Sequence, residues 1–401
     1  MAVPKLRFKT DDGSDYPDLV EIKIGDAIKE AKRPLDMKDD EKYQLVTVKR
    51  RNEGIVSRGM FYGKDILVKN YYTVKKGDYI ISKRQVIHGA NGIVPPELDD
   101  AIVSNEYMVL SDSKALLAEY LALYSMTKKM YHMFFISSYG VDIEKMFFNV
   151  DDWKKKKIMA PCIKEQQKVV ELFSLIDTVI EKQKETVSAW EERKKGVMQK
   201  LFSQEVRFKA DDGSDFPEWE EKKLGDICKT FSGGTPKSGE ARYYDNGTIS
   251  FIRSGEIHDD KTELRITNDG LNESSAKMVD IGDILYALYG ATSGEVDISK
   301  IKGAINQAIL CIRPLNDFNR KFIVEILRYN KETILRTYLQ GGQGNLSAQI
   351  IQSLVFDFPC VAEQQKIADC LSSLDEVIEK QKTILAAWEE LKKGLLQQMF
   401  V

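Results

Sequence analysis

A long stretch of this chain occurs twice, and this duplication constrains the fold more than any other feature. The first copy begins at Pro161 and ends at Phe202, and the second begins at Pro359 and ends at Phe400. About half of the aligned positions are identical, at a constant separation of 198 residues. An internal repeat of this length predicts that the whole architecture is built from two related halves.

Both copies have the apolar spacing of a long helix. Apolar residues recur at alternating steps of four and three, which is the heptad pattern of a coiled coil. At about 1.5 Å per residue, a helix of about 36 residues is roughly 54 Å long. We expect the two helices to pair within one chain; an ordinary dimerisation segment is the alternative. The candidate positions for helix pairing and partner docking are Ile176, Ile180, Gln183, Trp190, Leu374, Ile378, Gln381 and Trp388.

A shorter repeat precedes each body of the chain. Residues 7–26 and 207–226 are identical at about two-thirds of their positions, and both contain the turn-rich sequence DDGSD. The chain is therefore interpreted as two tandem cassettes, each with an opening segment, a body and a long helix. The predicted divisions are 1–160, 161–203, 204–358 and 359–401.

The two bodies share an order of landmarks but differ in content. Short runs of β-branched and aromatic residues bounded by Gly, Asn and Asp predict strands in both. Residues 113–135 and 320–339 have helical apolar spacing and predict one late helix in each body. The predicted fold class is α/β (α+β), with mixed strands and helices. A duplicated frame with diverged contents indicates two related sites that recognise different things.

Composition excludes several classes of protein. The chain has 401 residues, 43% of them hydrophobic and 30% charged, and no apolar run approaches the ~18 residues of a membrane span. The start of the sequence lacks the apolar core of a signal peptide. The five cysteines are odd in number and lack C-x-x-C spacing, so neither a disulfide framework nor a zinc site is predicted. We expect a cytoplasmic protein without a membrane partner.

Catalytic motifs are missing from the sequence. The only Pro-Pro pair, Pro95-Pro96, lacks the flanking residues of an amino-methyltransferase tetrad, and no phosphate-binding P-loop occurs. Asp18 and Glu21 are too close in sequence for a metal-dependent nuclease site, and the three histidines lie far apart. We therefore expect no catalytic residue, no metal site and no cofactor in this chain.

Two motifs and their order point to a family. Each long helix opens with Pro-x-x-x-Glu-Gln, at Pro161…Glu165-Gln166 and at Pro359…Glu363-Gln364. The second body adds, in order, FSGGTPKSG, FIRSGEI, LYGATSG, INQAI and GGQGNLSAQII. Over its full length the chain resembles the specificity (S) subunit of Type I restriction-modification systems. The first body lacks the Ser-Gly-Gly-Thr-Pro and Asn-Leu-Ser elements, so residues cannot be carried over to it from that pattern.

The resemblance implies a function. A specificity subunit is not catalytic, and its two long helices form an antiparallel intramolecular coiled coil that separates two target recognition domains. Each domain binds one half of a split site in double-stranded DNA. Two methyltransferase (M) subunits and the restriction (R) subunits join it in the bacterial or archaeal cytoplasm. S-adenosylmethionine, ATP and Mg²⁺ are used by those partners. A coiled-coil adaptor without sequence-specific DNA binding, and an enzyme that fuses recognition with methylation, are the alternatives.

Loops after the predicted strands supply the candidate DNA-binding residues. Residues 42–90 hold eleven Lys or Arg against three Asp or Glu, an excess that suits phosphate contacts. Arg can bond a guanine edge and Asn or Gln an adenine edge, although phosphate contact or plain solvation is the alternative at each position. The candidates are Lys49, Arg50, Arg51, Asn52, Lys83, Arg84 and Gln85 in the first body and Thr235, Lys237, Arg253, Ser254, Tyr289, Thr292, Gln343 and Asn345 in the second.

Overall fold

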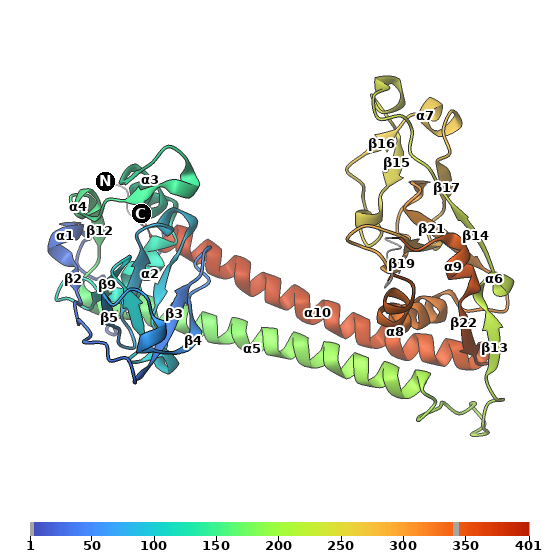
Figure 1. The fold of residues 1–401 in the computed structure, drawn as a ribbon, viewed down its shortest axis with the longest axis horizontal. Helices are drawn as coiled ribbons and strands as arrows, with labels where there is room; N and C mark the ends of the chain where they lie inside the picture. Colours follow the sequence, from blue (N-terminus) through green and yellow to red (C-terminus); the bar gives the residue numbers. More distant parts are fainter. Residues whose placement is uncertain (1–3, 340–344, 401) are drawn as a thin grey trace. The chain divides into compact units, whose positions relative to one another are not determined.

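A computed structural model of the chain describes residues 4–339 and 345–400 (Figure 1). The chain divides into two compact units. The first unit consists of Met1–Glu185 with Thr383–Val401, and the second unit consists of Thr186–Lys382. Each unit therefore holds one strand-rich body together with part of both long helices.

The first body contains twelve strands and four short α-helices among the described residues. The strands are β1 (Val20–Lys23), β2 (Lys29–Glu30), β3 (Lys42–Val48), β4 (Ile55–Tyr62), β5 (Tyr71–Thr73), β6 (Tyr79–Ser82), β7 (Asn91–Ile93), β8 (Ile102–Ser104), β9 (Tyr107–Ser111), β10 (Ser138–Tyr139), β11 (Phe147–Phe148) and β12 (Lys157–Ala160). The helices are α1 (Ile24–Ala27), α2 (Ala118–Ser125), α3 (Lys128–Ile136) and α4 (Val150–Lys154), and the long helix α5 (Ile163–Phe202) follows them.

The second body has ten strands and four helices in the part of the chain that the structure describes. The strands are β13 (Glu220–Lys223), β14 (Cys228–Ser232), β15 (Ile249–Ile252), β16 (Arg265–Ile266), β17 (Lys277–Val279), β18 (Ile284–Ala287), β19 (Val296–Ile298), β20 (Gly303–Ile305), β21 (Ile309–Pro314) and β22 (Val355–Phe358). The helices are α6 (Leu224–Ile227), α7 (Asn268–Asn272), α8 (Arg320–Leu339) and α9 (Ala348–Ser353), and the long helix α10 (Val361–Met399) follows.

The two bodies have the same sheet topology. The first has four-stranded sheets in the orders β2-β9-β6-β7 and β4-β3-β8-β5, and the second has β14-β21-β18-β19 and β16-β15-β20-β17. In each body one pair, β3 with β8 or β15 with β20, is parallel, and the other pairs in these sheets are antiparallel. The strands of these four-stranded sheets thus correspond one to one, as the duplicated landmarks in the sequence predict.

The central strands β6 and β18 are buried on both faces. Tyr79 and Ile81 of β6 belong to the core that reaches the long helices, while Ile80 faces a second core between the two sheets. In β18, Tyr286 and Leu285 divide between two cores in the same way. A strand that is covered on both faces has a continuous run of apolar residues, whereas a strand covered on one face alternates apolar and polar residues. This accounts for the short apolar runs of β6 and β18.

The late helices differ between the bodies. Helix α8 begins at Arg320 and ends at Leu339, which confirms the prediction for residues 320–339. The single helix predicted for 113–135 is wrong, because two helices, α2 and α3, occupy that region. Thr127 separates them: its side chain accepts a hydrogen bond from the Met130 backbone N–H at 3.2 Å and caps α3.

Helices α5 and α10 pair in opposite directions within each unit (Figure 1). In the first unit, Val169 and Phe173 near the start of α5 share a core with Met399 and Phe400 at the end of α10. The rings of Phe173 and Phe400 have centroids 6.3 Å apart. The second unit repeats this arrangement with Met198, Leu201, Ile367 and Leu371. The predicted antiparallel intramolecular pairing is confirmed.

Lysines in the helix pair bond to aspartates on the opposite helix. Lys194 of α5 lies 2.7 Å from Asp375 of α10 in the second unit. In the first unit Lys392 of α10 bonds Asp177 of α5 at 2.5 Å. The two ion pairs are equivalent, with the roles of the two helices exchanged. Asp177 corresponds to Asp375, and Lys194 corresponds to Lys392, at the separation of 198 residues. Two polar positions of the heptad pattern are therefore satisfied across the helix pair, which favours one register over its alternatives.

The Pro-x-x-x-Glu-Gln motif joins each long helix to its own cassette. Glu165 is buried and accepts hydrogen bonds from the Arg7 guanidinium, with Nε at 3.1 Å and Nη2 at 2.6 Å. Gln166 is also buried; its amide donates to Pro161 and Ala115 oxygens, and its oxygen accepts from the Leu117 N–H. The second cassette repeats the ion pair with Arg207 and Glu363. The opening segment and the start of the helix therefore form one structural element, which explains why the same two motifs recur together.

Membrane and metal features were searched for in the described ranges. No helix within residues 4–339 and 345–400 is long and apolar enough to cross a membrane. Within the same ranges no group of three or more His, Cys, Asp or Glu side chains is placed to hold a metal ion.

Candidate nucleic-acid interface

In the first unit, two of the predicted loops lie against each other. The chain turns after β3, and Arg51 and Asn52 adopt left-handed backbone conformations with φ of 60° and 57°. Their N–H groups donate to the carbonyl oxygens of His88 at 2.7 Å and Gly89 at 2.9 Å. Non-glycine residues with positive φ are uncommon, and such strain is concentrated at functional sites. The loop after β3 is thus fixed to the loop after β6 by backbone hydrogen bonds.

Asn52 is oriented by a buried hydrogen-bond chain. Its Oδ1 accepts from the Asn91 amide at 3.0 Å, and Asn91 Oδ1 accepts from the Tyr79 hydroxyl at 3.0 Å. Burial raises the pKa of Tyr79 far above its usual value, which keeps this phenol a donor. The oxygen and nitrogen of both amides follow from this network. Asn52 therefore has its oxygen engaged toward the core and its N–H₂ group left as a donor.

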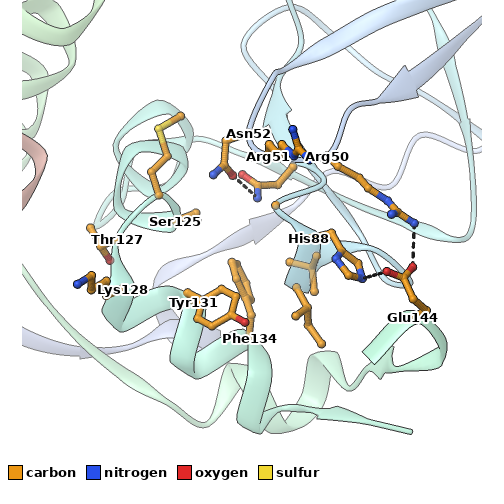
Figure 2. A pocket seen from close by; sticks show the side chains of 15 residues that line it. Arg50, Arg51, Asn52, His88, Ser125, Thr127, Lys128, Tyr131, Phe134 and Glu144 are labelled. Atoms are coloured by element: carbon orange, nitrogen blue, oxygen red, sulfur yellow. Dashed lines mark hydrogen bonds and ion pairs between the residues drawn. The ribbon is translucent and has the colours of Figure 1, made fainter. Parts of the chain in front are cut away.

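A cavity of about 600 Å³ opens beside this loop. Figure 2 shows Arg50 and His88 both directed toward Glu144, at 3.1 Å and 3.5 Å. Thr127 and Lys128 line the opposite wall. Cationic groups outnumber the single carboxylate in the lining, so the cavity suits an anionic ligand such as a phosphate or nucleotide.

Three of the remaining candidates of the first unit follow β6, and Lys49 follows β3. The Lys83 ammonium group donates to the Asn105 carbonyl oxygen at 2.7 Å. Arg84 donates from Nε to Glu106 at 2.5 Å, and its guanidinium lies 5.8 Å from the Phe147 ring. Gln85 is half-buried, and its Oε1 has no hydrogen-bond partner among the described residues. Lys49 is exposed.

In the second unit, Arg253 is held by two carboxylates. It bonds Glu256 at 3.1 Å and Glu263 at 2.5 Å, and these hydrogen bonds raise its pKa further above the usual value. Ser254 follows it in a short turn of 3-10 helix that ends at Glu256. The adjoining cavity of about 750 Å³ is lined by further acidic residues. An acidic lining repels phosphate, so the structure gives Arg253 a positioning role in its own loop, and its role as a base reader stays a prediction.

The other loops of the second unit converge around Gln307, which belongs to the INQAI motif but is not among the predicted DNA-binding residues. The Thr235 hydroxyl donates to Gln307 Oε1 at 2.6 Å, and the Leu288 N–H donates to the oxygen of Ala308, the residue after Gln307, at 2.8 Å. The Leu346 N–H donates to the Leu288 oxygen at 2.9 Å and so places the neighbouring Asn345 at the same loop cluster. Parts of four short motifs, FSGGTPKSG, LYGATSG, INQAI and GGQGNLSAQII, therefore lie together in the structure.

Glycines allow this convergence. A Cβ added to Gly233 would lie 1.8 Å from the Ile305 carbonyl oxygen, so only glycine permits the backbones to approach this closely. Lys237 and Asn345 are exposed, and Thr292 is half-buried in the turn after β18. Gln343 lies outside the described residues.

The helix candidates divide into buried and half-buried positions. Ile176, Ile180 and Ile378 are buried. Those that are half-buried are Gln183, Trp190, Leu374, Gln381 and Trp388. Their burial suits helix pairing, while partner docking stays a prediction for all of them.

The family model described as Type I restriction modification DNA specificity domain matches the chain twice, over residues 16–188 and 217–389. The chain belongs to this family. The two matches follow the duplication, since each covers one body and a large part of the long helix that follows it.

Similar proteins agree with this membership of the Type I specificity family. The MjaVIII specificity subunit of Methanocaldococcus jannaschii is 24% identical over 97% of this chain and 94% of its own length. A crystal structure of the Type I restriction-modification S subunit from M. genitalium has a TM-score of 0.60 at 14% identity, covering 100% of this chain and 99% of that chain. A structure from work on complex assembly and conformational transition of the Type I system has a TM-score of 0.58 at 19% identity, covering 96% and 98%. At such identities the solved structures support the fold alone.

Proposed function

We propose that the chain is the DNA sequence-specificity subunit of a Type I restriction-modification complex. It binds a bipartite target in double-stranded DNA, with one half-site for each recognition domain, 1–160 and 204–358. The helical segments 161–203 and 359–401 connect and space these domains. The observation that carries the proposal is one strand frame built twice with different side chains at its loop ends. Such a pair suits two separate sequences.

The chain itself performs no chemistry in this proposal. It positions two methyltransferase subunits and the restriction subunits in the cytoplasm of a bacterium or archaeon. S-adenosylmethionine, ATP and Mg²⁺ serve those partners. The names of the relatives as restriction enzyme specificity subunits support this assignment.

Sequencing of methylated DNA tests the proposal directly. The chain is expressed with its cognate methyltransferase subunit, and the modified sites are mapped across the genome. We expect one split site whose two halves are separated by unread base pairs. Methylation by the isolated chain would instead support a fused enzyme. Active complex formation without any site preference would support the adaptor alternative.

A further inference from the structure

The motif at the start of each long helix shows which residues correspond in the late helices of the two bodies. The Gln166 side-chain oxygen accepts from the Leu117 N–H at 3.0 Å, and the Gln364 oxygen accepts from the Asn319 N–H at 2.8 Å. Leu117 lies immediately before α2, and Asn319 lies immediately before α8. A residue at the end of α2 or the start of α3 therefore corresponds to the residue of α8 that lies 202 positions later, the difference between 117 and 319.

Helix α8 continues through the point at which the first body starts a new helix. Thr127, which caps α3, corresponds to Tyr329 in the interior of α8. The break in the first body places Lys128 on the wall of the cavity of about 600 Å³, and the positive end of the α3 dipole adds to that charge. Because α8 runs on from Arg320 to Leu339, the second body does not form this wall.

Three side chains that line this cavity keep unused hydrogen-bond donors. The side chains of Arg51 and Lys128 are exposed and have no hydrogen bond or ion pair with any residue in 4–339 or 345–400. The Asn52 oxygen accepts from Asn91 at 3.0 Å, which leaves the Asn52 N–H₂ group as the third donor. Figure 2 shows Arg51 and Asn52 on one side of the cavity and Lys128 on the other.

The single carboxylate in the lining is already paired. Glu144 bonds Arg50 at 3.1 Å and lies 3.5 Å from His88 Nε2. The positive charges of Arg51 and Lys128 therefore have no counter-ion in the cavity, so an anion that enters it meets free cationic groups rather than a free carboxylate.

The corresponding loop of the second body has the opposite charge. Strand β15 occupies the place of β3 in the sheet order, and the loop after it lines a cavity of about 750 Å³. That lining combines Arg253 and Lys261 with four carboxylates, those of Glu256, Asp259, Asp260 and Glu263. Two of these carboxylates bond Arg253. The two bodies thus share a strand order but differ in the charge that they present at this loop.

We propose that the cavity of the first unit binds a phosphate group of the DNA backbone and anchors the duplex beside the first half-site. The inference rests on the proposed function and adds to it a binding site that contributes affinity for any sequence. Contacts from Arg and Lys to phosphates fix the position of a protein on a duplex but carry no sequence information directly. The volume leaves room for the sugars on either side of the phosphate.

The test replaces Arg51 and Lys128 together by glutamine in the complex with the cognate methyltransferase subunit. Both side chains are exposed, and glutamine removes the charge while keeping a polar chain, so the fold is retained. We expect Arg51→Gln with Lys128→Gln to weaken binding to cognate and unrelated duplexes by the same factor, about 10- to 100-fold near physiological salt. The slope of log affinity against log salt should fall by about 1.8, and the methylated sites should stay the same.

Lys129→Gln is the matched control, since Lys129 is the next residue of α3 and is exposed but does not line this cavity. It should leave the affinity and the salt slope nearly unchanged. Glu144→Gln should act in the opposite direction from the double variant. It removes the only carboxylate of the lining and releases Arg50, so affinity should rise on every duplex.

A changed methylated sequence in the double variant would identify base contacts and overturn the inference, as would an unchanged salt slope. Inorganic phosphate or ATP that binds the wild-type complex but not the double variant, with equal DNA affinity in both, would assign the cavity to a free ligand and overturn its assignment to DNA. A wild-type complex that binds all duplexes equally would contradict the proposed function. In that case a lower salt slope in the double variant would still support the phosphate site.

Discussion

Arg7 and Arg207 each neutralise a carboxylate that is almost fully buried at the start of a long helix. Glu165 has 3% of its side chain exposed and Glu363 has 0%. Removal of the arginine leaves that charge without its main partner, and breaking a buried ion pair costs about 3 kcal/mol or more. Because Arg7 is itself partly exposed, we expect Arg7→Met to lower the unfolding free energy of the first unit by about 2–3 kcal/mol.

Urea unfolding followed by fluorescence measures this change. The control is Lys9→Met, because Lys9 pairs with Asp15 at 3.4 Å while both side chains are largely exposed. That substitution should change the unfolding free energy by less than about 0.5 kcal/mol. Equal effects of the two substitutions would contradict the structural role of the Arg7–Glu165 pair.

His258 provides a pH-dependent contribution in the second unit. A hydrogen bond to Asp297 at 2.9 Å, together with the nearby Glu295 carboxylate, raises its pKa despite burial and the opposing charge of Arg328. A raised folded-state pKa means that the stabilisation is complete below the unfolded value of about 6.5 and is lost as the pH rises through the folded value.

We therefore expect wild type to exceed His258→Gln in urea midpoint by more at pH 6 than at pH 8.5. His132→Gln is the control, since His132 is exposed on α3 in the other unit. A difference between wild type and His258→Gln that is the same at both pH values would contradict the predicted contribution.

Sequence patterns locate candidate loops better than the individual residues within them. The loops after β3 and β6 carry basic residues in the sequence, but their contact through His88 and Gly89 is a tertiary feature. Gln307 lies 72 residues from Thr235 in sequence, so no local spacing indicates their hydrogen bond. Glu106 and Glu144 are missed for the same reason, because each pairs with an arginine from a distant loop.

At the scale of elements, Lys194 and Lys392 occupy equivalent positions of the two long helices but have different surroundings. Lys194 is 12% exposed and lies 3.0 Å from Glu325 of α8, which is 6% exposed, in addition to Asp375. Lys392 is 22% exposed and bonds Asp177, which is 48% exposed. Lys194 thus ties a recognition domain to the helix pair, while the Lys392–Asp177 contact joins the two helices.

We expect Lys194→Met to destabilise the second unit by about 2 kcal/mol, less than for a fully orphaned buried charge because Arg328 still bonds Glu325 at 2.7 Å. The matched control Lys392→Met should cost less than about 1 kcal/mol, as for partly exposed pairs. Urea unfolding of both variants is the measurement. A larger effect at Lys392 would contradict the asymmetry.

Helices were predictable where apolar residues recur over several turns and no side chain caps a new helix within the run. Helix α8 matches its expected range: its first turns, Phe322 to Leu327, are buried on all sides, and Ile334 continues the buried side further along. Residues 113–135 have a similar composition, but Thr127 prefers to cap a new helix by bonding the Met130 N–H. The helix is therefore interrupted because the Thr127 side chain competes for a backbone N–H group, and the spacing of apolar residues carries no sign of this.

At the scale of the whole molecule, we propose that the length of the helix pair sets the unread gap between half-sites. Four residues add about 6 Å and close to one helical turn, and base pairs are about 3.4 Å apart. Because the helices are antiparallel with ion pairs at Lys194 and Lys392, the insertion is made after both Gln183 and Gln381. We expect the half-sites to stay unchanged and the gap to grow by one or two base pairs.

Methylated-site mapping with the cognate methyltransferase subunit reads the gap. A four-residue insertion after Leu67, which is 96% exposed in a loop, is the control and should leave the gap as it is. Active methylation with a constant gap in the helix variant would contradict the spacing role.

The sharing of cores between cassettes also has a consequence for biosynthesis. Phe400 packs against Tyr120, Tyr124 and Phe173 in the first unit, although the ribosome makes it only after the entire second unit. The first domain to be synthesised therefore lacks part of its interior until translation reaches this residue. Apolar side chains of the first unit therefore stay uncovered on the nascent chain until Phe400 is made. The second unit can complete its core first, although its synthesis begins later.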